Sequence, residues 1–404
     1  MVPACRAVRG RRVRAAAASR NVWSEVFIMD IRRVFVAGLV GLAPVVAPAA
    51  ASPKLNPGYH YPDVDGARAG ALHEAIVNGM RAGAVQTLPS WTQGFSINGT
   101  QYSYTMLGTN PAQGGVTTNI PTVLVPIRLT VPDYLVKGQP LVLDATPTMP
   151  DILNSPIFTA SKFDSGNLQF EDAMLHAEFP TAPKGWHLIF TPSIAPTIDV
   201  TAPSGTVSVY QSKSGRYLGV VTDGKVFGKP ISEALRKKFS ANTYVVFVSY
   251  NSLFAGAFGF HSAYMNKAGT AVTVFTYTSW LEGVNDLFSL PSPNSDTFAH
   301  EISESTHDPF ITSLTLEWGD WFNNNRCFQP YIEVGDAVED APAKVQNYKQ
   351  TVMVNGKPRI YTLQTEAMLP WFTREYPSSA LHGAYSYPGE NVLLGPAPFT
   401  CKRH

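Results

Sequence analysis

Hydrophobic runs along the chain predict a protein with much β-structure. The run 243–250 is apolar almost throughout, which is typical of a central strand buried on both faces. Asn98-Gly99 and Asn355-Gly356 each separate two strand-like runs, and this dipeptide is a strong hairpin signal. Further strands are predicted at 117–131, 186–191, 205–210 and 270–280. Pro126 lies inside the first of these and predicts a sheet edge or a bulge there.

Hydrophobic residues at helical spacing interrupt these strands in a few places. Helices are predicted at 66–86, 168–179, 231–239 and 296–308, whereas residues 310–345 resemble an acidic loop. The pattern indicates an α+β fold, with a mixed or antiparallel sheet, hairpins and a few inserted helices. We expect residues 52–404 to form a single α+β domain, which can be divided into a β-rich part, 52–228, and a second part, 229–404.

The first 51 residues have the form of an upstream extension followed by a secretory signal peptide. Residues 1–28 are rich in Arg and Ala and resemble sequence that lies upstream of the true translation start. The alternative is that they form an unusually long n-region of the signal peptide. A second start at Met29 is followed by Arg32-Arg33, an apolar run over 34–47 and the small residues 49–52. This predicts a secreted or periplasmic protein. The mature chain has no other apolar run long enough for a membrane span.

Removing the predicted signal peptide changes the charge. Residues 1–51 contain eight arginines and two acids, so the rest of the chain has 23 basic and 28 acidic residues, a net charge of −5. An acidic chain without a basic cluster argues against nucleic acid as a partner. Cys5 lies in the removed segment, and Cys327 and Cys401 remain. In an exported chain two cysteines predict one disulfide, with two unpaired thiols as the alternative.

The helix predicted at 296–308 carries the strongest chemical signal. His300, Glu304 and His307 are spaced to share one helix face, and all three side chains can bind a metal ion. Glu301 follows His300 directly, as the general base does in the His-Glu-x-x-His helix of zinc peptidases. The fifth position of that motif is Glu304 here instead of His.

A zinc centre needs a third protein ligand in addition to His300 and Glu304. The candidates are Glu333 and Asp336 in a Glu-x-Gly-Asp segment, with His261 and His307 as additional candidates. His307 lies two turns from His300, about 10 Å along the helix axis. The alternative is a solvated polar face, because His-Glu pairs also arise by chance, as at His73-Glu74.

Several short motifs in this region occur in the order found in one family. The string His-Glu-x-x-Glu-x-x-x-Asp-Pro at 300–309, the segment Gly259-Phe260-His261 before it and Glu333-Val334-Gly335-Asp336 after it resemble the phosphate-induced, Exordium-like family of exported proteins and related bacterial proteins. The resemblance covers roughly 240–340. His307 stands where the family usually has Thr, and Ala337 where a Cys often follows the last motif. The family implies a metallopeptidase-like helix, and it assigns no chemistry beyond that.

We therefore expect an exported, zinc-dependent, peptidase-like hydrolase in which Glu301 activates a metal-bound water. The alternative is a non-enzymatic extracellular or cell-wall-associated binding protein that keeps a structural His/Glu helix. Partners would be a peptide or a cell-wall polymer, for which the aromatic segment 318–322 can line a groove or simply pack under a loop. Ca²⁺ is a second candidate ion, held by acidic residues that are otherwise solvated: Asp308, Asp320, Glu333, Asp336, Glu339 and Asp340.

Overall fold

The computed structural model describes residues 85–288, 293–318, 329–339 and 347–389, together with residues 78–79 and 83. The predicted signal peptide, nearly all of the predicted helix 66–86, residues 319–322 of the aromatic segment and both Cys327 and Cys401 lie outside these residues. In the described part of the chain, no helix has the length and hydropathy needed to cross a membrane.

A mixed seven-stranded sheet forms the centre of the molecule, in the order β13-β14-β11-β3-β4, with β7 and β8 also paired to β3. The hydrophobic run predicted as a central strand is β11, Tyr244–Tyr250, which is parallel to both of its neighbours. These neighbours are β3, Thr117–Val136, and β14, Val272–Trp280. At one edge β13, Gly259–Met265, runs antiparallel to β14. The predicted α+β class is confirmed.

Of the two alternatives predicted at Pro126, the sheet edge is wrong, because β3 is an interior strand. Over Thr122–Leu124, β3 pairs with β11 and with β7, His187–Ile194. Beyond Pro126 it pairs instead with β4, Gln139–Asp144, and β8, Ile198–Thr201. The proline, which has no N–H to donate, thus sits where both neighbours of the strand change.

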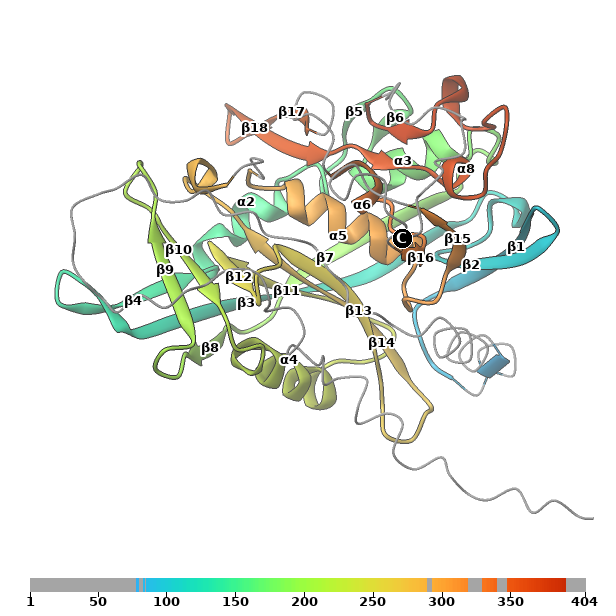
Figure 1. Cartoon of the computed structure of the whole chain (residues 1–404). Coiled ribbons are helices and arrows are strands. Elements are labelled where there is room, and N and C mark those ends of the chain that lie inside the picture. Colours follow the sequence, from blue (N-terminus) through green and yellow to red (C-terminus); the bar gives the residue numbers. More distant parts are fainter. Residues whose placement is uncertain are drawn as a thin grey trace, which may run out of the picture.

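One helix covers each face of this sheet (Figure 1). Helix α5, Asp296–His307, packs on one face with the larger core cluster, and α4, Lys225–Lys238, packs on the other with a second cluster. Alternate residues of β11 divide between the two clusters, with Val246 in the first and Phe247 in the second. Helix α4 begins six residues before the predicted start at 231, and Pro230 lies inside it. The larger core cluster takes residues from Leu88 to Tyr387, on both sides of 228/229.

Hairpins surround the α5 face of the sheet. Both Asn-Gly turns are confirmed: β1, Ser90–Ile97, pairs with β2, Thr100–Leu107, and β17, Asn347–Val354, pairs with β18, Lys357–Gln364. Asn98 and Gly99 have φ values of 51° and 81°, which the two central residues of this turn require. The region predicted as a loop, 310–345, contains the short pair β15, Leu314–Trp318, and β16, Gln329–Tyr331, and the helix α6, Asp336–Glu339.

The remaining elements are short, apart from α3. Helix α3, Phe170–Glu178, confirms the helix predicted at 168–179 and contacts α5. The others are α2, Met149–Leu153; α8, Leu369–Phe372; the paired strands β5, Ser161–Phe163, and β6, Gly166–Leu168; the three-stranded sheet of β9, Val207–Gln211, β10, Tyr217–Val221, and β12, Ser252–Phe254; and the pair β19, Glu366–Ala367, and β20, Ser386–Tyr387.

Candidate metal centre

Helix α5 is buried on all sides although nine of its twelve residues are polar. All twelve of its residues are buried, from Asp296 to His307. It lies between the sheet strands β13 and β14 and a layer formed by β18, β2 and α3 (Figure 1). Because a buried polar group is costly without a partner, each polar side chain of this helix must be satisfied inside the protein.

Strand β13 brings His261 against this helix. His261 shares its strand face with Ala263 and Met265, which pack against the same core cluster as α5. Its Nδ1 lies 3.3 Å from Oε2 of Glu304 and 3.9 Å from Oε2 of Glu301. Its Nε2 lies 3.8 Å from Oε2 of Glu333. Both ring nitrogens of His261 therefore face carboxylates.

His300 is oriented by Gln364 at the end of β18. The side-chain amide of Gln364 donates to the carbonyl of Gly335 at 2.7 Å, which turns its Oε1 toward Nδ1 of His300 at 3.0 Å. Nδ1 of His300 donates to Oε1 of Gln364, so Nε2 of His300 is directed at the carboxylates of Glu304 and Asp336. This Nε2 lies 3.1 Å from Oε1 of Glu304 and 3.5 Å from Oδ1 of Asp336. A second partner that fixes the ring in this way is typical of metal-binding histidines.

Glu304 lies between the two histidines. Its Oε2 faces His261 and its Oε1 faces His300, and Oε1 also accepts the backbone N–H of Asp336 at 3.2 Å. Burial raises the pKa of this carboxyl, but His300 and the hydrogen bonds from both histidines outweigh burial and hold the pKa well below its usual range. Burial lowers the pKa of His300, yet Glu304 and Asp336 raise it well above its ordinary value.

Three other carboxylates at this centre are buried without enough donors. Oε2 of Glu301 and both carboxylate oxygens of Glu333 and of Glu366 are buried and accept no hydrogen bond. Burial, followed by the negative charges of neighbouring carboxylates, keeps the pKa of each of these three side chains well above its ordinary value, although His300 lowers the pKa of Glu301 and Glu366. Within the described residues, the ion pairs of Glu301, Glu304 and Glu333 are all with histidines. The centre therefore carries an excess of acid over cationic groups.

The donor atoms form two groups that share Glu304. One group is His261, Glu301 and Glu304, and the other is His300, Glu304 and Asp336; in each, one ligand atom per residue lies within 4.8 Å of the others. Donors about 2.0–2.1 Å from a tetrahedral zinc ion are separated by about 3.3 Å. The separations of 3.3 Å between His261 and Glu304 and of 3.1 Å between His300 and Glu304 match that spacing. The sequence thus indicated residues that the fold brings together.

His307 and Asp308 have other partners. Nδ1 of His307 donates to the carbonyl of Ser303 at 2.7 Å, and its Nε2 lies 3.2 Å from Oε2 of Glu178 on α3. Asp308 ends α5, and its carboxylate accepts the backbone N–H groups of Thr312 and Ser313 at 2.8–3.0 Å. His307 therefore forms an ion pair with Glu178 of α3, and Asp308 stabilises the turn that follows α5. Of the other Ca²⁺ candidates, Asp320, Asp340 and the side chain of Glu339 lie outside what the structure describes.

Sequence reasoning missed Gln364, Glu366 and the α3 glutamates. Glu366 follows a hairpin with no local motif around it, and its pKa shift reflects burial and the proximity of His300 and Glu304. Glu171 of α3 accepts from Ser303 at 2.7 Å and lies 3.7 Å from His307, and burial raises its pKa to about 7. No spacing rule connects these residues to α5, since they are distant in sequence.

No family model, no curated protein and no solved structure matches this chain. The resemblance to the phosphate-induced, Exordium-like family therefore stays a prediction.

Proposed function

We propose that this protein is an exported metalloprotein that binds a divalent metal ion, zinc being the first candidate, at Glu304 and the histidines beside it. The observation that carries this proposal is the set of buried carboxylate oxygens on Glu301, Glu333 and Glu366 that accept no hydrogen bond. Buried charges are normally paired or coordinate a metal, and otherwise such groups hold protons instead. A divalent cation supplies the positive charge that the described side chains lack.

The donor set favours zinc over calcium. Imidazole nitrogens suit Zn²⁺ and related transition metals, whereas Ca²⁺ is held by six to eight oxygen atoms. His261 and His300 both present nitrogens to Glu304. Glu304 is the residue that both donor groups share, so the centre depends on it more than on any other side chain.

The burial of the centre favours a stabilising role for the ion. His261, His300, Glu301 and Glu304 are each at most 1% exposed. Structural zinc sites are closed by protein ligands, whereas catalytic sites keep a position open to substrate. We therefore infer that the ion holds α5, β13 and the segment 333–336 together, in the manner of a non-enzymatic extracellular protein.

Hydrolysis is the second candidate function, and the position of Glu301 is what favours it. Its Oε2 accepts no hydrogen bond and lies beside His261, so this carboxylate, once it has lost the proton that burial favours, can accept one from an attacking water molecule. Such an activity requires α5 to become accessible to a peptide or a cell-wall polymer.

Elemental analysis of the purified protein tests metal binding. We expect at least one equivalent of a divalent transition metal per chain in the natural protein and about one equivalent less in Glu304→Gln. Glu233→Gln, which replaces a half-exposed glutamate of α4, is the matched control and should keep the metal. A metal-free natural protein that takes up no more added Zn²⁺ than Glu304→Gln does would overturn the proposal.

Glu301→Gln separates the two roles of the centre. In a hydrolase this variant keeps its metal and loses about 100-fold or more of its peptide-hydrolysing rate, because the general base is removed. In a structural centre the natural protein hydrolyses neither a peptide library nor cell-wall material above the rate of the metal-stripped protein. The second result would exclude the hydrolase while leaving metal binding in place.

A further inference from the structure

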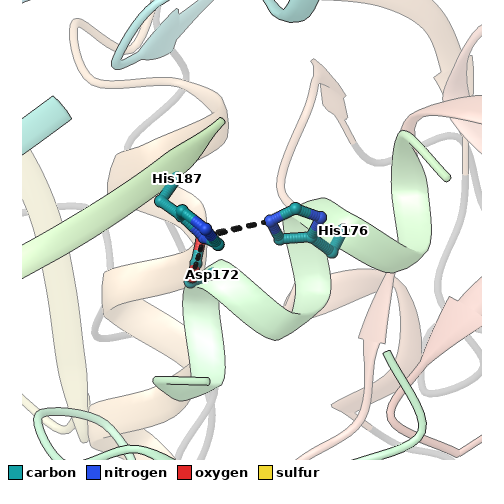
Figure 2. A group of neighbouring side chains, drawn as sticks. All are labelled: Asp172, His176 and His187. Atoms are coloured by element: carbon teal, nitrogen blue, oxygen red, sulfur yellow. Dashed lines mark hydrogen bonds and ion pairs between the residues drawn. The ribbon is translucent and has the colours of Figure 1, made fainter. Parts of the chain in front are cut away.

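A second group of metal-binding side chains lies where α3 meets β7. Asp172 and His176 are one turn apart on α3, and His187 is the first residue of β7. Figure 2 shows the rings of His176 and His187 turned toward one another, with the Asp172 carboxylate beside His187. These three residues share none of the side chains of the centre on α5.

The donor atoms of this group converge. Nδ1 of His187 lies 2.9 Å from Oδ2 of Asp172 and 3.2 Å from Nε2 of His176, which in turn lies 3.8 Å from Oδ1 of Asp172. For a tetrahedral ion with bonds of about 2.0–2.1 Å, donor atoms are about 3.3 Å apart. Asp172 faces His187 with Oδ2 and His176 with Oδ1, and one ligand atom from each of the three residues lies within 4.8 Å of the others, a spacing that one ion can bridge.

Proton sharing alone does not satisfy this arrangement. Nδ1 of His187 carries at most one proton, yet it faces a carboxylate oxygen and an imidazole nitrogen at hydrogen-bonding distance at the same time. A proton directed at Asp172 leaves two imidazole nitrogens facing each other without a well-aligned hydrogen between them. A cation between the three donors removes that conflict.

The surrounding residues hold the three side chains in place. The carboxylate of Asp172 is buried, and its Oδ1 accepts the backbone N–H of Leu188 at 3.0 Å. The ring of Trp186 packs edge-on against His176 with 5.6 Å between centroids, and the indole N–H donates to the carbonyl of Thr109 at 2.7 Å.

We propose that Asp172, His176 and His187 form a second, solvent-accessible site for a divalent transition-metal ion, separate from the buried centre on α5. Two imidazoles and one carboxylate suit Zn²⁺ or Fe²⁺ and leave coordination positions open. The side chains of His176 and His187 are 20% and 30% exposed, so water or a small anionic ligand can reach those positions. The site therefore exchanges its ion with solvent faster than the buried centre does.

Calorimetric titration with ZnCl₂ tests this site in the full chain. The natural protein and Glu304→Gln should both show this zinc-binding event, and adding His187→Ala or His176→Ala to either should weaken it by more than about tenfold. His382→Ala removes a histidine outside both groups and should leave it unchanged. Equal binding with and without His176 and His187 would overturn the proposal, whatever the buried centre does.

A second measurement uses the natural protein and so does not depend on the folding of a variant. Diethyl pyrocarbonate modifies accessible histidines, and mass spectrometry locates the modified residues. Saturating Zn²⁺ should protect His176 and His187 at least about tenfold, by blocking their nitrogens, while His382 stays reactive. Unchanged modification of His176 and His187 in the presence of Zn²⁺ would contradict the site.

Discussion

The imidazole of His300 lies directly against the backbone of Gly335. A β-carbon at residue 335 would lie 2.6 Å from Cγ of the His300 ring, closer than real contacts allow. The same relationship holds on the other side of α5, where a β-carbon at Gly259 would lie 2.6 Å from Cγ of Glu301. Because Gly335 and Gly259 have no side chains, they leave room for the side chains of His300 and Glu301, respectively.

Gly335→Ala should displace the His300 ring and weaken the centre. Overpacking of this kind costs about 1–3 kcal/mol of folding free energy, and the displaced ring should also lower the bound metal content. Thermal unfolding and elemental analysis measure the two effects. Gly228→Ala is the matched control, because its added methyl meets only the Phe254 ring, at 3.7 Å, and Ala is favoured over Gly in a helix.

An unchanged metal content and melting temperature in Gly335→Ala would show that the ring of His300 can move without consequence. That result would remove the geometric role assigned to Gly335.

The stabilisation by metal should grow as the pH rises. In the metal-free protein, burial raises the pKa of Glu301, Glu333 and Glu366, so the stability of that form is highest below their unfolded value of about 4.5 and falls as the pH rises through their folded values. A bound cation replaces those protons, and metal affinity rises as they are released. The difference in melting temperature between zinc-loaded and chelator-treated protein should therefore increase from pH 5 to pH 8. A constant difference would mean that the ion does not compete with protons at these carboxylates.

His307→Gln should remove a separate pH dependence. Burial lowers the pKa of His307, but Glu178 and Glu171 outweigh burial and raise it from 6.5 to about 9. Its contribution to stability is thus complete below pH 6.5 and is lost as the pH rises through 9, a change of up to about 3 kcal/mol. Denaturant unfolding of the metal-free protein at pH 6.5 and 9 measures it, with His382→Gln as control. Parallel profiles for the natural protein and His307→Gln would exclude the ion pair with Glu178.

Gln364→Leu should weaken metal binding without touching a proposed ligand. The substitution removes the acceptor for Nδ1 of His300 and one of the two donors to the carbonyl of Gly335, which keeps the backbone N–H of Val338 at 3.2 Å. Loss of such an orienting partner typically lowers metal affinity by 10–100-fold. Competition with a chromophoric chelator measures the affinity. Gln350→Leu, in the facing strand of the same hairpin, removes only a hydrogen bond to the carbonyl of Lys162 and should leave the affinity unchanged.

Local sequence signals were sufficient to predict most of the longer helices and strands, but they did not predict all residues of the metal centre on α5. Asn-Gly turns, the apolar run of β11 and the spacing of His300 and Glu304 depend on neighbours in sequence, so they could be predicted. Gln364 and Glu366 reach α5 only because the hairpin β17–β18 folds over that helix, and no periodicity encodes that contact (Figure 1). The partners of His307 were missed for the same reason, since Glu178 lies 129 residues away in the chain.

The interior position of Pro126 shows a related effect. Proline disfavours strand interiors locally, and the prediction of an edge or a bulge at Pro126 followed that preference. In β3 the change of partner strands accommodates the missing N–H, which depends on the order of strands in the sheet.

Anomalous diffraction at the zinc absorption edge, from crystals of the zinc-loaded protein, tests the metal centre most directly. We predict a peak about 2.0–2.2 Å from a carboxylate oxygen of Glu304 and from a ring nitrogen of His261 or His300. Absence of any peak within bonding distance of Glu304, with the carboxyls of Glu301 and Glu333 holding protons instead, would contradict the account.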